Sequence, residues 1–478
     1  MQELETVLRG GTVVTASDQY RADVGIAGGR IVAIADSLRG ANEVDAGGLL
    51  VLPGGVDSHV HVEQPGSDGS MTADDFETGT RSAACGGTTT IIPFAVQEKG
   101  KGLRASVDAY RRRGEGRAWI DFAIHLIVSD PSEAVVGQEL PALIRDGYTS
   151  FKVYMTYDDL KLDDRQLLDV LALARREGAM TMVHAENSDC IAWITQRLAA
   201  KGRTAPRFHA TSRPMPVERE ATHRAIALGE LVDTPMLLVH VSGREAVEEI
   251  RRAQARGLRV YGETCPQYLY LTEDDLGAPG FLGARCVCSP PPRDRANQEV
   301  IWDALASGVF QVFSSDHAPY RYDDARGKKL AGDDAPFWKI PNGVPGIETR
   351  MPLLFDGVSR GRITLQQFVA LTATNPARIY GLSGRKGSVS IGADADIVLW
   401  DPSCARTIRN ADLHHAVDYT PYEGIEVRGW PVHVMSRGEF VLRDGAPVDR
   451  RGHGRFLPCD PPEPARPRGQ PVLPADLV

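Results

Sequence analysis

Two histidines one residue apart, in the run His59-Val60-His61, are the first candidates for chemistry in this chain. They follow the apolar residues of a segment that reads as a β-strand, in which alternate side chains face the same side. Both imidazoles could therefore reach one metal ion. The same pair alone is also compatible with solvent-facing or hydrogen-bonded histidines, so the metal hypothesis depends on further ligands.

Such ligands stand within or at the ends of other apolar runs: Lys152, His184, His240 and Asp316. A lysine inside an apolar strand is costly to bury as an ammonium. A neutral lysine can add carbon dioxide and become a carbamate, an anionic ligand with two oxygens, and burial near cations favours that neutral form. Four imidazoles, one carboxylate and one carboxylated lysine suit two zinc ions.

Eight apolar runs alternate with amphipathic stretches such as Asp163–Glu177 and Arg244–Arg256. Strands separated by helices pair in parallel, and eight such units predict a (β/α)8 TIM barrel of the α/β class. An open doubly wound sheet is the alternative, and it is disfavoured because no Gly-x-Gly-x-x-Gly run follows a first strand. The expected strands are Val56–Val62, Thr88–Ala95, Asp121–Val128, Ser150–Thr156, Ala179–Glu186, Met236–Ser242, Val260–Leu269 and Gln311–Ala318.

Both ends of the chain carry short strands punctuated by glycines, which predicts a smaller β-sandwich domain built from both ends. We expect residues 1–53 and 388–450 to form it, with the catalytic barrel at 54–387. The N-terminal strands expected are Thr6–Arg9, Thr12–Thr15, Ala22–Ile26 and Arg30–Ile34. The extension 451–478 is rich in proline, so it should form no regular ladder and should lie on the surface or on a neighbouring subunit.

The composition excludes several classes of partner. The net charge of −9 provides no basic excess for nucleic acid or an anionic membrane. The first residues lack the apolar segment of a secretory signal, and no apolar run is long enough to span a bilayer. Seven cysteines without a disulfide-type spacing indicate reduced thiols and a cytoplasmic protein. Cys286 and Cys288 are expected to fill space in a strand.

The chain resembles the cyclic amidohydrolases of the amidohydrolase superfamily, most of all the dihydropyrimidinases and D-hydantoinases. The motifs that carry this resemblance extend over nearly the whole chain. They are Pro53-Gly54-Gly55-Val56-Asp57-Ser58-His59-Val60-His61, Ala73–Thr80, Gly86–Thr90, Phe151–Tyr157, His184–Asn187, Glu263–Leu269, Cys288–Arg293 and Pro341–Glu348.

The resemblance implies a role for each candidate residue. His59, His61 and Asp316 would hold one zinc, His184 and His240 the other, and carboxylated Lys152 would bridge both together with a hydroxide. Asp316 would act as general base and then acid, and Tyr157 would donate a hydrogen bond to the oxyanion. The backbone groups of Ser289 and Asn342 would hold the cyclic imide. A homotetramer, or else a homodimer, is also implied.

The resemblance leaves the substrate open. The expected reaction is hydrolysis of 5,6-dihydrouracil and dihydrothymine to N-carbamoyl-β-amino acids, with hydantoins as further substrates. The segment Glu63–Ser70 is less apolar than in many hydantoinases, and Pro93 stands where aspartate is common, which favours a dihydropyrimidinase over a D-hydantoinase for 5-substituted hydantoins. Allantoinase and dihydroorotase are more distant, because no arginine follows His61. A non-catalytic scaffold is disfavoured because all six ligand positions are filled.

Overall fold

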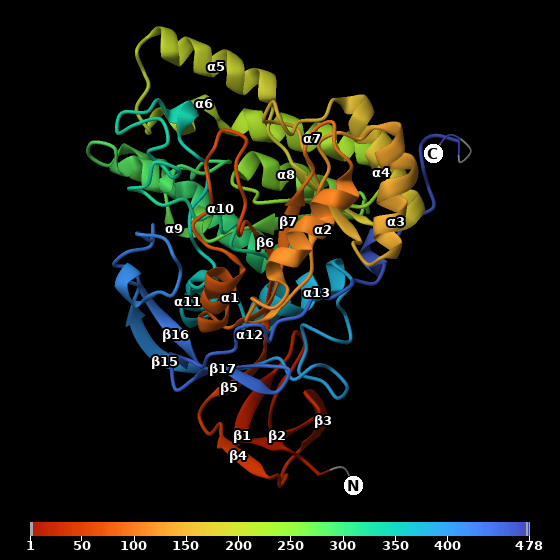
Figure 1. The fold of residues 1–478 in the computed structure, drawn as a ribbon, viewed down its shortest axis with the longest axis vertical. Helices are drawn as coiled ribbons and strands as arrows, with labels where there is room; N and C mark the ends of the chain where they lie inside the picture. Colours follow the sequence, from red (N-terminus) through yellow and green to blue (C-terminus); the bar gives the residue numbers. More distant parts are fainter. Residues whose placement is uncertain (1–2, 475–476, 478) are drawn as a thin grey trace.

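The computed structural model describes residues 3–474 and 477, which form a barrel surrounded by helices and a second sheet beside it (Figure 1). The barrel strands are parallel and lie in the order β14-β13-β12-β11-β10-β9-β7-β6, with β8 paired to β7. Their bounds are β6 Gly55–Val60, β7 Thr88–Val96, β8 Asp121–Phe122, β9 His125–Ile127, β10 Ser150–Tyr154, β11 Met180–His184, β12 Met236–Leu238, β13 Val260–Thr264 and β14 Val312–Phe313.

The ends of this sheet approach each other. A parallel bridge joins Val60 to His317, and the amide of His61 donates to the His317 carbonyl at 2.7 Å. The sheet is therefore a nearly closed barrel, and the predicted TIM barrel is confirmed against the open-sheet alternative. All eight strands lie where the apolar runs predict them. The third is split into β8 and β9, and the seventh ends at Thr264, because residues 267–270 turn into a helix.

Helices cover the outside of the barrel, and their local sequence explains where they begin and end. In α4 the side chain of Asp163 accepts from the amide of Gln166, and Gly178 ends the helix with a φ of 71°. The helices are α1 Phe76–Cys85, α2 Leu103–Gly114, α3 Leu140–Arg145, α4 Asp164–Glu177, α5 Ser188–Ala200, α6 Phe208–Ser212, α7 Met215–Leu231, α8 Arg244–Ala255, α9 Gln267–Tyr270, α10 Arg295–Ala306, α11 Arg350–Ser359, α12 Leu365–Val369 and α13 Asn375–Ile379.

The second sheet takes strands from both ends of the chain and forms a separate sandwich domain, as predicted. Its order is β18-β17-β16-β15-β5-β1-β2-β3, with β4 paired to β1, and the two ends meet where β5 lies antiparallel to β15. The strands are β1 Thr6–Val14, β2 Gln19–Ala27, β3 Arg30–Ala35, β4 Asn42–Asp45, β5 Leu50–Pro53, β15 Ile397–Thr407, β16 Glu426–Ser436, β17 Glu439–Arg443 and β18 Ala446–Pro447.

Two local predictions are wrong. Thr6–Arg9 and Thr12–Thr15 are one strand, β1, because the chain forms a bulge between Leu8 and Gly11 opposite β2 instead of a turn. Cys286 and Cys288 are buried as expected, but they do not lie in a strand. Cys286 ends a single helical turn, Leu282–Cys286, and Cys288 lies in the loop after it.

The C-terminal extension packs along the barrel of its own chain. The amide of Leu457 donates to the carbonyl of Phe122, and that of Cys459 donates to Gly147. Within the described residues it forms one isolated bridge, Phe122 to Phe456, in keeping with its proline content. Residues 475, 476 and 478 of this predicted extension lie outside the described residues, as do residues 1–2 of the predicted sandwich. In the described part of the chain, no helix is long and apolar enough to cross a membrane.

Candidate metal centre

The six predicted ligands come from five barrel strands and meet at the carboxyl ends of those strands. His59 lies in β6, Lys152 in β10 and His184 at the end of β11, whereas His61, His240 and Asp316 lie just beyond the ends of β6, β12 and β14. Five of the side chains are buried and His61 is partly buried. In a TIM barrel this end of the strands is where catalytic groups gather.

The described residues bring three of these side chains within direct reach of one another. Oδ1 of Asp316 lies 3.2 Å from Nε2 of His59 and 3.5 Å from Nε2 of His61. Nζ of Lys152 lies 2.9 Å from the same nitrogen of His59. The ligand atoms of His59, His61 and Asp316 all lie within 4.8 Å of one another, which makes this group a candidate metal site.

The outer nitrogens of the two histidines are held by different partners. Nδ1 of His59 lies 2.6 Å from Oε1 of Glu263, and Nδ1 of His61 lies 2.6 Å from Oε1 of Gln64. Gln64 is oriented by its amide group, which donates to the carbonyl of Phe94 at 2.7 Å. A proton on each Nδ1 leaves the Nε2 lone pairs facing Asp316, as a metal ligand requires.

The second pair of histidines lies beside the first. The rings of His184 and His240 are 4.4 Å apart between centroids, and those of His59 and His240 are 5.3 Å apart. Nε2 of His184 lies 2.8 Å from Glu186, which also accepts from Arg213 at 2.7 Å. Nδ1 of His240 is buried and has no hydrogen-bond partner among the described residues. An orphaned nitrogen of this kind fits a ligand position.

Burial sets the charge state of the site. It lowers the pKa of His59, His184 and His240, so these imidazoles are neutral and able to bind a cation. It also lowers the pKa of Lys152 to about 8. Burial alone would raise the pKa of Asp316, but the hydrogen bond with His61 and the neighbouring positive groups bring it below its ordinary value.

Three predicted site residues have a left-handed backbone: Tyr157 with a φ of 69°, His240 with 38° and Asp316 with 46°. Few residues other than glycine adopt this conformation, and those that do are concentrated at functional sites. Here each follows a barrel strand, so the backbone turns sharply where the strand ends. We infer that the strand ends are bent to direct these side chains inward.

Tyr157, Ser289 and Asn342 lie together at the same end of the barrel. The Tyr157 ring is 5.4 Å from that of His184, and burial raises its pKa to about 12 although Arg213 and a hydrogen bond with Ser289 oppose the rise. In the described structure, the backbone N–H and C=O groups of Ser289 and Asn342 enter no hydrogen bond within the chain. Oδ1 of Asn342 is likewise buried without a partner.

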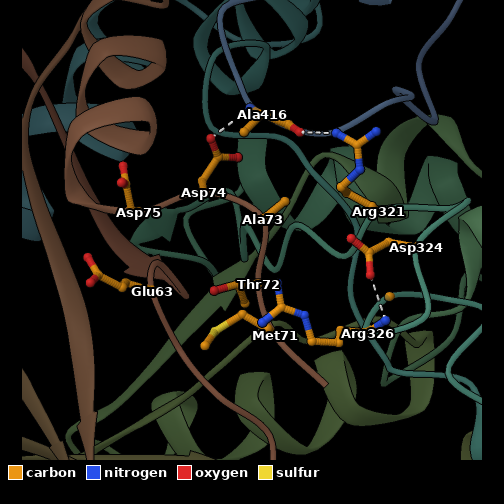
Figure 2. Close-up of a pocket in the computed structure, with 11 residues that line it drawn as sticks. Glu63, Met71, Thr72, Ala73, Asp74, Asp75, Arg321, Asp324, Arg326 and Ala416 are labelled. Atoms are coloured by element: carbon orange, nitrogen blue, oxygen red, sulfur yellow. Dashed lines mark hydrogen bonds between the residues drawn. The ribbon is translucent and has the colours of Figure 1, made fainter. Parts of the chain in front are cut away.

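A separate cavity of about 370 Å³ is lined by none of the six ligands (Figure 2). Its walls are the segment after His61, with Glu63 and Met71–Asp75, and the loop Arg321–Gly327. Across it the amide of Met71 donates to the carbonyl of Arg326 at 3.0 Å. A second group of potential ligands, Cys85, Glu348 and His414, is explained by the bonds that Glu348 accepts from Ser82 and His414.

The sequence did not reveal the residues that support the ligands. Glu263 and Gln64 are separated from the histidines they orient by 204 and 3 residues, respectively. Glu186 could have been found from its place two residues after His184, just beyond the end of β11. Arg213 gives no sequence signal, because it lies in the short connection between α6 and α7.

Comparisons with known proteins agree with this geometry. Residues 50–441 match the amidohydrolase family. The chain is 44% identical to a D-hydantoinase of Ralstonia pickettii (95% of this chain, 98% of the relative) and 46% identical to one of Geobacillus stearothermophilus (94% and 96%). The crystal structure of dihydropyrimidinase from Brevibacillus agri superposes with a TM-score of 0.93 at 44% identity, covering 97% of this chain and all of the other.

The chain therefore belongs to the amidohydrolase family. The prediction that it is an enzyme of the cyclic amidohydrolase type is confirmed, because the similarity to hydantoinases and a dihydropyrimidinase extends over nearly the whole length of both chains.

Proposed function

We propose that this enzyme opens the cyclic amide of dihydropyrimidines, converting 5,6-dihydrouracil and dihydrothymine to N-carbamoyl-β-amino acids. The observation that supports this most is the position of the unpaired backbone groups of Ser289 and Asn342 near a cluster of neutral imidazoles and a buried lysine. A cyclic imide offers one N–H between two carbonyls, and free backbone donors and acceptors match that pattern.

The donor set fits two zinc ions. His59, His61 and Asp316 would hold one and His184 and His240 the other, with Lys152 as an N6-carboxylated bridge. The buried, unpaired Nδ1 of His240 and the pKa of Lys152 near 8 support this assignment. Bound there, the two cations would lower the pKa of a shared water and polarise the amide carbonyl.

The protein's own groups would handle the proton and the developing charge. Asp316 would accept the proton of the attacking water and return it to the leaving nitrogen. The Tyr157 phenol, which keeps its proton because its pKa is about 12, would donate a hydrogen bond to the amide oxygen as that oxygen gains negative charge. Arg213 and Glu186 would hold His184 and the Tyr157 face of the site in place.

Hydantoins are the second candidate substrates, because the relatives from Ralstonia and Geobacillus are D-hydantoinases. The polar segment after His61 favours dihydropyrimidine rings that carry no large apolar substituent: Gln64 and Ser70 are buried there, and Ser70 is hydrogen-bonded to Tyr320. A small homo-oligomer, a tetramer or a dimer, and a cytoplasmic location complete the proposal.

One substrate panel tests the proposal: dihydrouracil, dihydrothymine, hydantoin, phenylhydantoin, allantoin and dihydroorotate, assayed spectrophotometrically on the zinc-loaded enzyme. We expect the two dihydropyrimidines to have the highest kcat/KM. A large preference for phenylhydantoin would favour the second candidate. A large preference for allantoin or dihydroorotate would contradict both.

A further inference from the structure

Lys328 is a completely buried lysine outside the candidate metal centre. It lies in the loop after β14, at the end of a wide turn in which the Lys328 amide donates to the Arg321 carbonyl at 2.8 Å. The residue before it must be glycine, because a Cβ at Gly327 would come within 2.0 Å of that carbonyl oxygen. The turn also forms part of the wall of the cavity in Figure 2.

The Lys328 side chain donates to three backbone carbonyls and to no carboxylate among the described residues. Its Nζ lies 2.9 Å from the oxygen of Val287, 2.8 Å from that of Pro341 and 2.6 Å from that of Gly343. Burial lowers its pKa to about 7, whereas three acceptors match the three N–H donors of the ammonium form. An arrangement that keeps a buried cation on carbonyl dipoles alone is costly, which calls for an explanation.

The positions of these three carbonyls explain why the lysine is buried there. Pro341 and Gly343 flank Asn342 on both sides, and Val287 lies two residues before Ser289. The carbonyl of Val287 also accepts from the amide of Gly343 at 2.9 Å, so the two segments meet at Lys328. The carbonyl between them, that of Cys288, lies 2.9 Å from Nε2 of His209. The neighbouring carbonyls are thus occupied, while the backbone groups of Ser289 and Asn342 stay free.

We propose that Lys328 is a positioning residue that sets the spacing between the Ser289 and Asn342 backbone groups, and thereby the recognition of the imide edge of the substrate. The inference rests on the proposed function, since that function gives Ser289 and Asn342 their ligand. Lys328 does not contact the substrate: it acts through the three carbonyls. Its removal should weaken binding of the ring without disturbing the metal ligands.

The test is Lys328→Met, which keeps an unbranched chain of similar length but removes the donors. We expect KM for dihydrouracil to rise about tenfold or more, the loss of roughly one hydrogen bond, while kcat changes less than threefold and the zinc content is unchanged. Lys329→Met is the matched control, because Lys329 is the next residue but its amine pairs with Asp333 and lies over the Tyr322 ring, away from the three carbonyls. An unchanged KM in Lys328→Met would overturn the proposal.

A substrate analogue separates positioning from general destabilisation. Methylating the imide nitrogen removes the ring's N–H donor and should weaken binding to the wild type. If Lys328 positions the backbone groups that bind the imide edge, methylation should reduce the binding affinity less in Lys328→Met than in the wild type. The reason is that the two changes disturb the same contacts. An undiminished penalty would show a merely structural role. Lys328→Gln, which retains two N–H donors, should be intermediate and replaces Lys328→Met if that variant does not fold.

Calorimetric measurement of imide binding distinguishes a failure of the proposed function from a failure of the role proposed for Lys328. If the wild type binds the imide but does not open it, the proposed function is wrong, and the Kd values of the variants still judge Lys328. If the wild type neither binds nor opens any imide of the panel, both proposals are overturned.

Discussion

The two ends of the barrel each bury a lysine, and the two lysines have opposite properties. At the carboxyl ends of the strands, Lys152 has a pKa lowered to about 8 by burial, and its Nζ lies 2.9 Å from Nε2 of His59. At the junction with the second sheet, Lys386 lies within 3.1 Å of oxygens from Asp121, Asp394 and Asp396, and these carboxylates raise its pKa despite burial.

The difference lies in the neighbours. Lys386 is held as a permanent cation that joins the start of β8 to the start of β15, and Arg437 adds a second positive group on Asp121. The lowered pKa of Lys152 makes a larger fraction of it a neutral amine than in an ordinary lysine, and the neutral amine is the form that can react with carbon dioxide. The comparison separates a lysine that stabilises the fold from one that is prepared for chemistry, and variants of each can test it.

The largest effect is expected for Lys152→Ala. Losing the bridge between the two metal positions should reduce kcat/KM by about 10³-fold or more, since bound cations supply several kcal/mol to such reactions. Zinc content measured by mass spectrometry should fall with activity. The control is Lys386→Met, whose kcat should stay near that of the wild type. An active Lys152→Ala enzyme, or an active enzyme without metal, would contradict the catalytic role of Lys152.

Lys386→Met should instead affect stability. It leaves the buried Asp396 and the partly buried Asp394 without Lys386, and Asp121 with Arg437 as its remaining cation. Breaking a buried ion pair in this way costs about 3–5 kcal/mol in the free energy of unfolding. Denaturant titration measures it, with Lys386→Arg as the charge-retaining control. A loss below about 1 kcal/mol would show that the cluster contributes little.

The stability that Lys386 contributes should depend on pH. The folded pKa of Lys386 is raised above its ordinary value of 10.5, so its stabilisation is complete below that pH. It is lost as the pH rises further through the folded pKa. The stability difference between wild type and Lys386→Met should therefore shrink above pH 10.5 and stay constant from pH 7 to 9.

Tyr157→Phe tests the charge-stabilising group beyond the Lys152 strand. Removing one preorganised donor to an oxyanion lowers kcat by about 10²–10³-fold, and metal content should not change. The matched control is Tyr270→Phe, which removes a partly buried hydroxyl that donates to the Leu353 carbonyl away from the site. Equal effects in both variants would contradict the role proposed for Tyr157.

The smallest expected effect is that of Gln64→Leu. The substitution removes the Gln64 oxygen that fixes the His61 ring. We therefore expect the zinc affinity to fall about 10–100-fold, which a chelator competition assay measures. Gln97→Leu is the control: Gln97 is equally buried and hydrogen-bonded, but to Lys101 and to the Ser129–Asp130 segment. Comparable zinc affinity in the two variants would show that Gln64 does not orient the ligand.

The sequence could predict what depends on local patterns. Apolar runs located all eight barrel strands, and residues at the ends of those runs located the six ligand candidates. Glu263, Arg213 and Lys328 could not be found in this way, because each acts on partners that the fold, not the local sequence, brings near. The pair Gly10-Gly11 is compatible with a turn or with one strand that carries a bulge, and only the pairing with β2 distinguishes the two.

The antiparallel pairing of β5 with β15 has a consequence for the newly made chain. These strands are separated by the whole barrel, so β5 lacks its partner until residues beyond Ile397 have been synthesised. At about 5–20 residues per second, the N-terminal strands leave the ribosome tens of seconds before β15. During that interval the edge of β5 is exposed, and we expect this stage of synthesis to be the one most prone to mispairing.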